Sequence, residues 1–275
     1  VDRAFALRHG IRGSGRDALE RLRELDARVL VGSDNLARLA KRRLLGAPLA
    51  GVPVIDDVTV VGEPQDHFLA GDARPVPVLI GSTAVDVPCH LPPSRLRPLS
   101  WFGADEDAAR AAYDVPNRRL LPPKVLVRLL LSIGADLTMH EPARFVAETT
   151  VTAGKPAFVY RFTYTAESTR PESLAQTHAG EVPFLFDTID ARYGDAVTPG
   201  DRAIATTFNR YVANFAISGD PNGPGLTHWP EVVPGDPDLM HFALDGPVVE
   251  PDPRPGVALV ARARAAHASR TSGDR

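Results

Sequence analysis

The sequence predicts an α/β layered fold, and three observations carry this prediction. An apolar run over residues 76–81 and an aromatic run over 157–166 are both typical of strands in a buried sheet. Apolar residues recur at helical spacing elsewhere, most clearly over 123–133 and 198–218. Strands and helices therefore alternate along the chain, which is the pattern of a sheet covered by helices.

The N-terminal part of the chain is predicted to be helical. Residues 15–25 form an amphipathic pattern, because leucines recur at three-residue steps and charged residues occupy the other positions. These leucines are Leu19, Leu22 and Leu25. A second helix is expected over 33–45, with Ser33 as its N-cap and Gly46 just beyond its end.

The first predicted strand, 76–81, is short, apolar and closed by Gly81. Pro77 has to lie near its start, because proline lacks the N–H group that a sheet ladder needs. Three helices are expected after this strand, over 104–114, 123–133 and 136–150. The third is expected even though Pro142 falls within its first turns.

The second predicted strand, 157–166, carries aromatic residues that alternate along one face. These residues are Phe158, Tyr160, Phe162 and Tyr164. The clearest helix is 198–218, where Thr198 and Asp201 form a capping-box pattern and Gly219 is placed to end the helix. Its apolar stripe predicts burial of three aromatic side chains, Phe208, Tyr211 and Phe215. A last strand is expected over 239–244, and a disordered tail from residue 266.

Composition and charge exclude several classes of protein. The 275 residues carry 31 Lys and Arg against 34 Asp and Glu, so no cationic excess is available for binding nucleic acid. No apolar stretch approaches the roughly 18 residues of a membrane-spanning helix. The single cysteine cannot form an intrachain disulfide, which favours a reducing compartment such as the cytoplasm. Nearly all cations are arginines, a usage typical of GC-rich bacterial genomes, and the sequence leaves the oligomeric state open.

The motifs of several enzyme classes are missing from the sequence. There is no G-x-G-x-x-G fingerprint, Walker lysine, H-E-x-x-H or paired C-x-x-C pattern, and no G-x-S-x-G nucleophile elbow. Ser14 lies between two glycines, but no strand precedes it, so we interpret it as the start of a helix. Cys89 and His90 are too few ligands for zinc, which takes about four. The sequence therefore implies neither a metal nor an organic cofactor.

An acid and a histidine that each follow a predicted strand form the candidate catalytic pair. Asp86 comes five positions after Gly81, and His178 follows the 157–166 strand. Ligands of open α/β sheets gather at the carboxyl ends of the strands. A histidine can take the proton of a serine hydroxyl, and a carboxylate can orient the histidine and stabilise its imidazolium form. The ordinary alternative is that the aspartate forms a turn and the histidine is solvated.

Two longer segments resemble a known family. Residues 178–186 read HAGEVPFLF, which is similar to the H-G-x-E-[LIV]-P-F-x-F segment of type B carboxylesterases, the family of cholinesterases and bacterial para-nitrobenzyl esterases. Residues 214–230, NFAISGDPNGPGLTHWP, resemble the N-F-A-x-x-G-D-P-N-x-P-G-L-x-x-W-P stretch of the same family. The strand end at Ile80 and Gly81 is similar to the I-G-x-x-x-D-E-G turn of the family.

This resemblance implies an α/β-hydrolase fold and a hydrolase that cleaves a small-molecule ester through an acyl-serine intermediate. It places His178 as the catalytic base and Asp86 as the triad acid, which is usually glutamate in the family. Aspartate is one methylene shorter, so its loop has to approach His178 more closely. Glu181 matches the acid three residues after the histidine, and we expect a structural role for it. Three other acids lie outside the matching turn and are poorer candidates, namely Asp56, Asp57 and Asp66.

The resemblance also implies that residues 1–265 are the C-terminal portion of one α/β-hydrolase domain. The serine elbow and the oxyanion segment precede this region in the family, so the isolated chain is expected to be inactive. Two rival interpretations are a non-catalytic cholinesterase-like module that binds a partner and an inactive truncated product. Three apolar residues are candidates for an acyl pocket or for ordinary packing, namely Leu91, Leu130 and Phe184.

Overall fold

The structure is a computed structural model that describes residues 3–31, 55–72, 74–87, 92, 94–118, 120–170 and 175–273. The chain divides into two compact units, Val1–Glu63 and Pro64–Arg275. The helix that the sequence predicts over 33–45 lies outside the described residues, as do Cys89, His90 and Leu91.

The first unit contains three short helices, α1 (Arg3–Arg8), α2 (Arg16–Arg23) and α3 (Ala27–Val31). Helix α2 confirms the amphipathic helix predicted over 15–25. Ala18 and Leu22 pack in a small apolar cluster, whereas Leu19 is 43% exposed. Leu25 also packs against this cluster, so two of the three predicted leucines contribute to it and Leu19 does not. Ser14 is exposed in the turn before α2, which agrees with its interpretation as the start of a helix.

The second unit is built on a four-stranded sheet in the order β1 (Val78–Thr83), β2 (Ala157–Phe162), β3 (Asp238–Ala243) and β4 (Gly246–Pro251). The first three strands are parallel, and β4 returns antiparallel to β3. The three predicted strands are thus confirmed. The sequence does not predict β4, which follows β3 through a tight turn.

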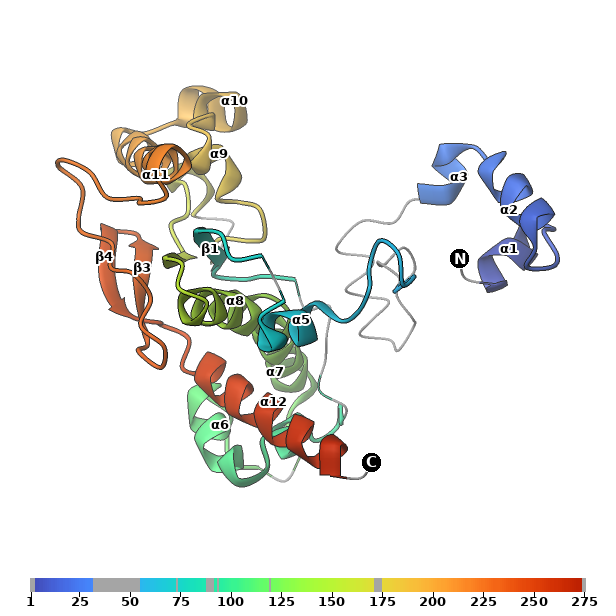
Figure 1. Ribbon diagram of the computed structural model, residues 1–275. Coiled ribbons are helices and arrows are strands. Elements are labelled where there is room, and N and C mark those ends of the chain that lie inside the picture. Colours follow the sequence, from blue (N-terminus) through green and yellow to red (C-terminus); the bar gives the residue numbers. More distant parts are fainter. Residues whose placement is uncertain are drawn as a thin grey trace. The chain divides into compact units, whose positions relative to one another are not determined.

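Helices alternate with loops along the rest of the described second unit, as Figure 1 shows. Those before β2 are α5 (Pro64–Ala70), the 3-10 segment η1 (Pro98–Asp105), α6 (Glu106–Ala112), α7 (Pro123–Ala135), the π turn η2 (Asp136–His140) and α8 (Glu141–Thr152). Those after β2 are η3 (Glu167–Thr169), α9 (Val182–Leu185), α10 (Ile189–Tyr193), η4 (Gly194–Ala196), α11 (Pro199–Ser218) and α12 (Gly256–Gly273). The predicted helices over 104–114, 123–133, 136–150 and 198–218 all correspond to helical segments. Helix α12 continues to Gly273, whereas the sequence predicts a disordered tail from residue 266.

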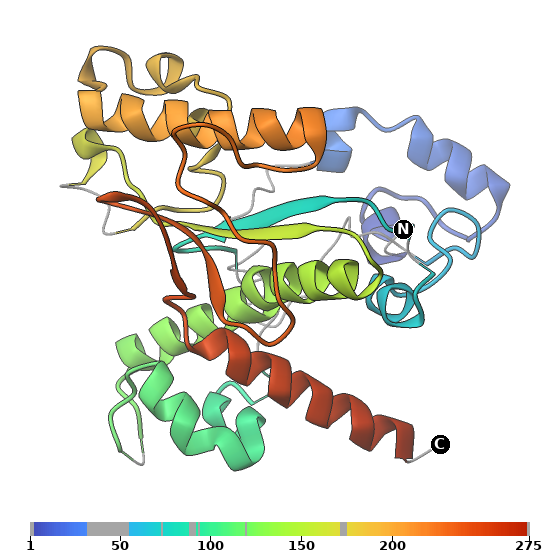
Figure 2. The same ribbon diagram turned by 60° about the vertical axis from the view of Figure 1, so that its left-hand side comes forward.

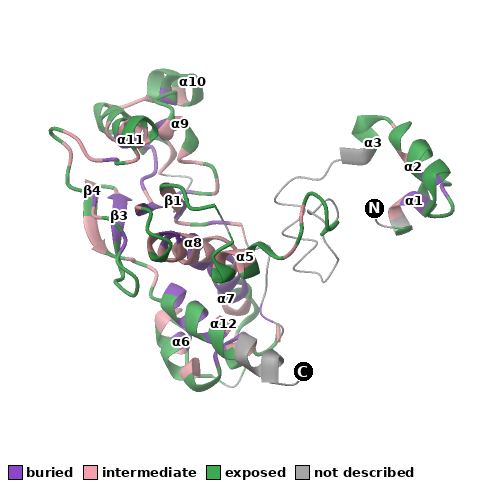
Figure 3. Cartoon of the chain, viewed as in Figure 1, coloured by how far each residue is buried: buried purple, intermediate pink, exposed green. Residues whose placement is uncertain are grey.

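The sheet of the second unit lies between two helical layers (Figure 2). Helix α11 covers one face of the sheet, and α8 covers β1 and β2 on the other face. Buried residues concentrate on the strands and on the inner faces of these helices, as Figure 3 shows. Strand β2 is buried along its whole length, which is what a central strand with helices on both faces requires. Strand β1 pairs only with β2 among the described residues.

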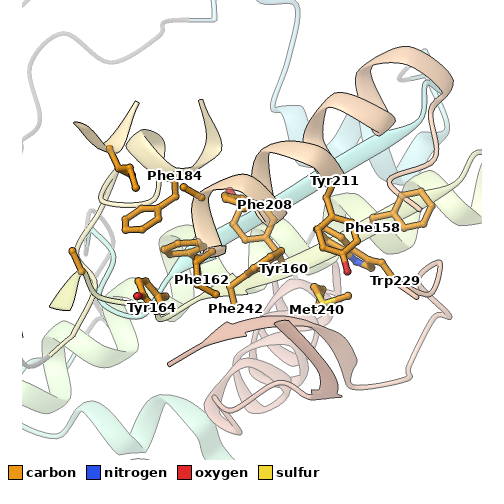
Figure 4. Packing of buried hydrophobic residues seen from close by; sticks show 14 residues of the cluster. Phe158, Tyr160, Phe162, Tyr164, Phe184, Phe208, Tyr211, Trp229, Met240 and Phe242 are labelled. Atoms are coloured by element: carbon orange, nitrogen blue, oxygen red, sulfur yellow. The ribbon is translucent and has the colours of Figure 1, made fainter. Parts of the chain in front are cut away.

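An aromatic cluster fills the space between α11 and the sheet (Figure 4). Phe158, Tyr160 and Phe162 alternate on this face of β2, as the sequence predicts, and Trp229 joins them fully buried. A side chain at Gly81 would place its Cβ 2.4 Å from the Tyr160 ring across the β1–β2 pair. Glycine there leaves room for the ring, and the strand runs two residues past Gly81 to Thr83.

Helix α11 begins and ends as the sequence predicts. The Thr198 hydroxyl accepts from the Asp201 N–H and the Asp201 carboxylate accepts from the Thr198 N–H, which is a complete capping box. Gly219 ends the helix in the left-handed conformation with φ of 79°. Phe208 and Tyr211 are fully buried, as predicted, but Phe215 is only partly buried beside the cluster. Phe215 lies near the C-terminal end of the helix, where the aromatic cluster covers it less completely.

No helix among the described residues is both long and apolar enough to cross a lipid bilayer.

Candidate active site

The two parallel strands β1 and β2 bring their following loops to the same edge of the sheet. The β1 loop carries Asp86, and the longer β2 loop carries His178. Val85 N–H donates to the Gln176 carbonyl at 2.9 Å, and Val85 forms a parallel bridge with Thr177. The two loops therefore lie side by side for one residue beyond the sheet.

This pairing joins the two residues that the sequence singles out. Nδ1 of His178 lies 2.5 Å from Oδ1 of Asp86. An ionised carboxylate only accepts hydrogen bonds, so the ring donates its Nδ1–H to Asp86. This arrangement leaves Nε2 as the nitrogen that can exchange a proton with another group. The His178 side chain is 34% exposed and that of Asp86 only 2%, so the acid is buried behind an accessible ring.

Main-chain and hydroxyl donors hold the Asp86 carboxylate in place. Oδ2 accepts from the Thr83 N–H at 3.2 Å and from the Thr83 hydroxyl at 3.4 Å. Oδ1 accepts from the Val87 N–H at 3.0 Å as well as from His178. These donors come from the turn that Asp86 itself closes, so the local chain orients the carboxylate toward the ring.

The turn after the histidine has a strained backbone. Ala179 has φ of 60°, a left-handed conformation that costs residues with a Cβ roughly 1–2 kcal/mol. At the next position, a Cβ on Gly180 would lie 2.7 Å from the Gln176 side chain. The resembling family motif has glycine where this chain has Ala179, so the turn keeps its shape here against a steric cost.

Glu181 lies close enough to the pair to interact with both charges. Burial raises the pKa of its carboxyl, and the Asp86 charge acts in the same direction while His178 opposes it. Its Oε2 atom is buried and has no hydrogen-bond partner in the described structure. Glu181 is therefore a partly buried acid next to the pair with a raised pKa and one carboxyl oxygen that makes no described hydrogen bond.

Two of the poorer acid candidates, Asp56 and Asp57, belong to the first unit, and Asp66 lies on α5 of the second unit. The Asp56 carboxylate accepts hydrogen bonds from the N–H groups of residues 58–60 within its own loop, and these bonds lower its pKa to about 2. Within the second unit, the described partner of His178 is Asp86 and not Asp66. Leu130 and Phe184, the candidates for an acyl pocket, are both buried in the packed interior. Ordinary packing therefore accounts for these two side chains.

A cavity of about 610 Å³ opens beside the Asp86 turn. Its walls are mostly apolar and include Val85, Val127 and Leu131, with Lys124 and Arg128 among the lining residues. Asp86 and Arg254 also line it. No group of three or more His, Cys, Asp or Glu side chains suited to a metal ion occurs among the residues that the structure describes.

A second group of buried polar side chains, which the sequence did not single out, lies behind the same turn. Asp136 is bound by His140 at 2.6 Å, by Arg254 at 2.7 Å and by the Tyr113 hydroxyl at 2.7 Å. Burial acts to raise the pKa of Asp136, but the hydrogen bonds from His140 and Arg254 outweigh it and hold the pKa below its usual range. The available signal was the four-residue spacing of Asp136 and His140, which places both on one face of a helix.

Comparison with known proteins agrees with this geometry. A sequence profile described as "Carboxylesterase family" matches residues 105–253, which is more than half of the chain. The chain belongs to the carboxylesterase family. Its mostly parallel sheet with helices on both faces is consistent with part of the α/β-hydrolase fold of that family, as the sequence predicts.

Curated members of the family cover most of the chain at low identity. Carboxylesterase 1D of Rattus norvegicus is 26% identical over 70% of this chain and 38% of its own length. Liver carboxylesterase 1 of Mus musculus is 27% identical over 68% of this chain and 37% of its own length. Cocaine esterase of Homo sapiens is 26% identical over 75% of this chain and 41% of its own length. The chain thus spans roughly two fifths of the length of these relatives.

Proposed function

We propose that the protein is a carboxylic ester hydrolase in which His178 is the general base and Asp86 is the acid that orients it. The 2.5 Å contact between His178 Nδ1 and the buried Asp86 carboxylate carries this proposal. Membership of the carboxylesterase family supports ester hydrolysis as the reaction class. The substrate is a small-molecule ester.

The proposed reaction follows the chemistry of a serine triad. Nε2 of His178 takes the proton of a serine hydroxyl while the serine oxygen bonds to the ester carbonyl carbon. The imidazolium then gives this proton to the departing alkoxide as the ester C–O bond breaks. Water repeats both steps on the acyl-serine and releases the carboxylic acid. Asp86 stabilises the imidazolium throughout, because its charge faces Nδ1.

The proposal also covers where the nucleophilic serine lies in the sequence. No G-x-S-x-G elbow occurs in these 275 residues, and family relatives are about two and a half times as long as the matching region. We place the serine in sequence that precedes this chain in the protein. Residues 1–265 are then the C-terminal portion of one hydrolase domain, as the family resemblance implies.

Hydrolysis of para-nitrophenyl acetate tests the assignment. The 275-residue chain alone should release para-nitrophenol no faster than an unrelated protein. In the protein extended by its upstream reading frame, His178→Ala should lower kcat about a thousandfold or more, because the general base is lost. His241→Gln is a matched control, since His241 also binds a carboxylate but lies on β3. Turnover by the isolated chain that His178→Ala abolishes would show that a nucleophile within it had been missed.

A fluorophosphonate probe separates this function from its rivals. It reacts covalently with an activated serine, so the extended protein should be labelled and His178→Ala should suppress the labelling. A folded extended protein that is not labelled would favour a binding module or an inactive product instead.

A further inference from the structure

Behind the proposed catalytic pair lies a second aspartate–histidine pair that the proposed reaction does not use. Asp136 and His140 come from the π turn η2 and are 0% and 1% exposed. Oδ1 of Asp136 is 2.6 Å from Nδ1 of His140. Such a buried pair is expensive to maintain unless both groups are fully hydrogen-bonded. The other hydrogen bonds of this pair therefore indicate which part of the structure it stabilises.

Two contacts connect this pair to the carboxyl end of β1. Nε2 of His140 lies 3.0 Å from the Thr83 carbonyl oxygen. Arg254, which donates its Nε–H to the same Asp136 oxygen at 2.7 Å, donates Nη1–H to the Ala84 carbonyl at 3.2 Å. One carboxylate oxygen thus anchors two donors that bind two successive carbonyls of the Asp86 turn.

Thr83 connects this cluster to the proposed acid. Its carbonyl binds His140, while its N–H and hydroxyl both contact Oδ2 of Asp86. A shift of the Thr83 residue would therefore move two of the donors that orient the Asp86 carboxylate. The ring of His178 would lose its alignment in turn, because Asp86 holds its Nδ1.

We propose that His140, anchored by Asp136, is a positioning residue for Asp86. Its catalytic importance rests on the proposed function, whereas its effect on the Asp86–His178 hydrogen bond does not. His140 makes no described contact with His178; it acts through Thr83, whose carbonyl it binds. Tyr113 and Arg254 complete the support of the Asp136 anchor, and Gly256 leaves space for it, since a Cβ there would lie 2.8 Å from Oδ2 of Asp136.

The protonation of His140 is part of this arrangement. Its two nitrogens face a carboxylate and a carbonyl, which both accept, so both bonds form together only in the doubly protonated ring. Burial lowers the pKa of His140, and the charges of Arg161 and Arg254 act in the same direction. The hydrogen bond to Asp136 opposes this effect. Asp136 does not outweigh burial and the two arginines, so the pKa of His140 lies below its usual value, and the positioning role rests on the contacts of the two ring nitrogens with Asp136 and Thr83.

The test measures the His178–Asp86 hydrogen bond directly in the 275-residue chain. With ¹⁵N-labelled histidine, the Nδ1 proton of His178 is observed by NMR, assigned by its loss in His178→Gln, and its exchange rate with water is measured. His140→Leu should increase this rate about tenfold or more, because Asp86 is no longer held. The matched control His241→Leu removes another buried histidine that binds Glu250 and Thr163, and it should leave the rate unchanged.

A milder variant covers the case in which His140→Leu does not fold. Tyr113→Phe removes only the hydroxyl that binds Asp136 and should produce a smaller increase in the same direction. Equal rates in wild type and in whichever of these variants folds would overturn the positioning role while leaving the proposed function intact. A wild-type chain without a protected Nδ1 proton would overturn both, because the catalytic pair itself would then be absent.

Discussion

Replacing Phe208 by alanine should remove a large part of the stability of the second unit. The ring is fully buried between α11 and the sheet, with centroids 4.5 Å from Phe242, 5.2 Å from Phe162 and 5.3 Å from Tyr160. Truncation of such a ring leaves a cavity that its aromatic neighbours cannot collapse into, and the expected loss is about 3–5 kcal/mol. Phe215 is partly buried and has its ring contact with Phe158 at 6.1 Å, so Phe215→Ala should cost about 1–2 kcal/mol.

Equilibrium unfolding in urea measures both losses. The buried Trp229 belongs to the same aromatic cluster, so tryptophan fluorescence reports its opening, and circular dichroism follows the helices. Phe186→Ala is the control, because that ring is 65% exposed and its loss should change the unfolding free energy by less than about 0.5 kcal/mol. A Phe208→Ala loss no larger than the Phe215→Ala loss would refute the packing that we describe.

Two further predictions concern the loop that carries His178. Burial raises the pKa of Glu181, so the stability from its bound proton is present in acid and is lost as pH rises through the raised pKa. Glu181→Gln should therefore unfold at a higher temperature than wild type at pH 7 but not at pH 4, and an equal difference at both pH values would contradict this. Ala179→Gly relieves the positive φ and should be neutral or stabilising by up to about 1 kcal/mol; a clear loss in thermal unfolding would show that the methyl group packs usefully.

The fold could be predicted largely because its strongest signals are local. Helix α11 carries its own cap and end signals, and β2 carries its own alternation, so neither depends on distant residues. Strand β4 has no comparable pattern, since GPVVEP begins with glycine and contains two prolines. It forms because the adjoining β3 offers an edge for antiparallel pairing. Tertiary pairing, rather than propensity, decides that element.

The candidate site likewise contains residues that a local sequence pattern predicts and residues that it does not. His178 could be found from a contiguous segment, and Asp86 from its position after a strand. The cluster around Asp136 joins residues that are 118 positions apart in the case of Arg254. No local sequence pattern predicts the contact between Asp136 and Arg254, because it depends on how β1, η2 and the start of α12 pack together. The sequence shows only that the residue types are present.

The shorter acid of this chain illustrates how such distant packing serves the site. The family resemblance predicts that aspartate needs a closer loop than glutamate does. The β1 loop does approach, because Val85 extends the β1–β2 pairing to the residues just before His178. The main-chain carbonyls of this turn also need hydrogen-bond donors, because the turn lies beyond the end of the sheet ladder. His140 and Arg254 bind the Thr83 and Ala84 carbonyls, so the cluster around Asp136 holds the turn in the position that lets a short carboxylate reach the ring.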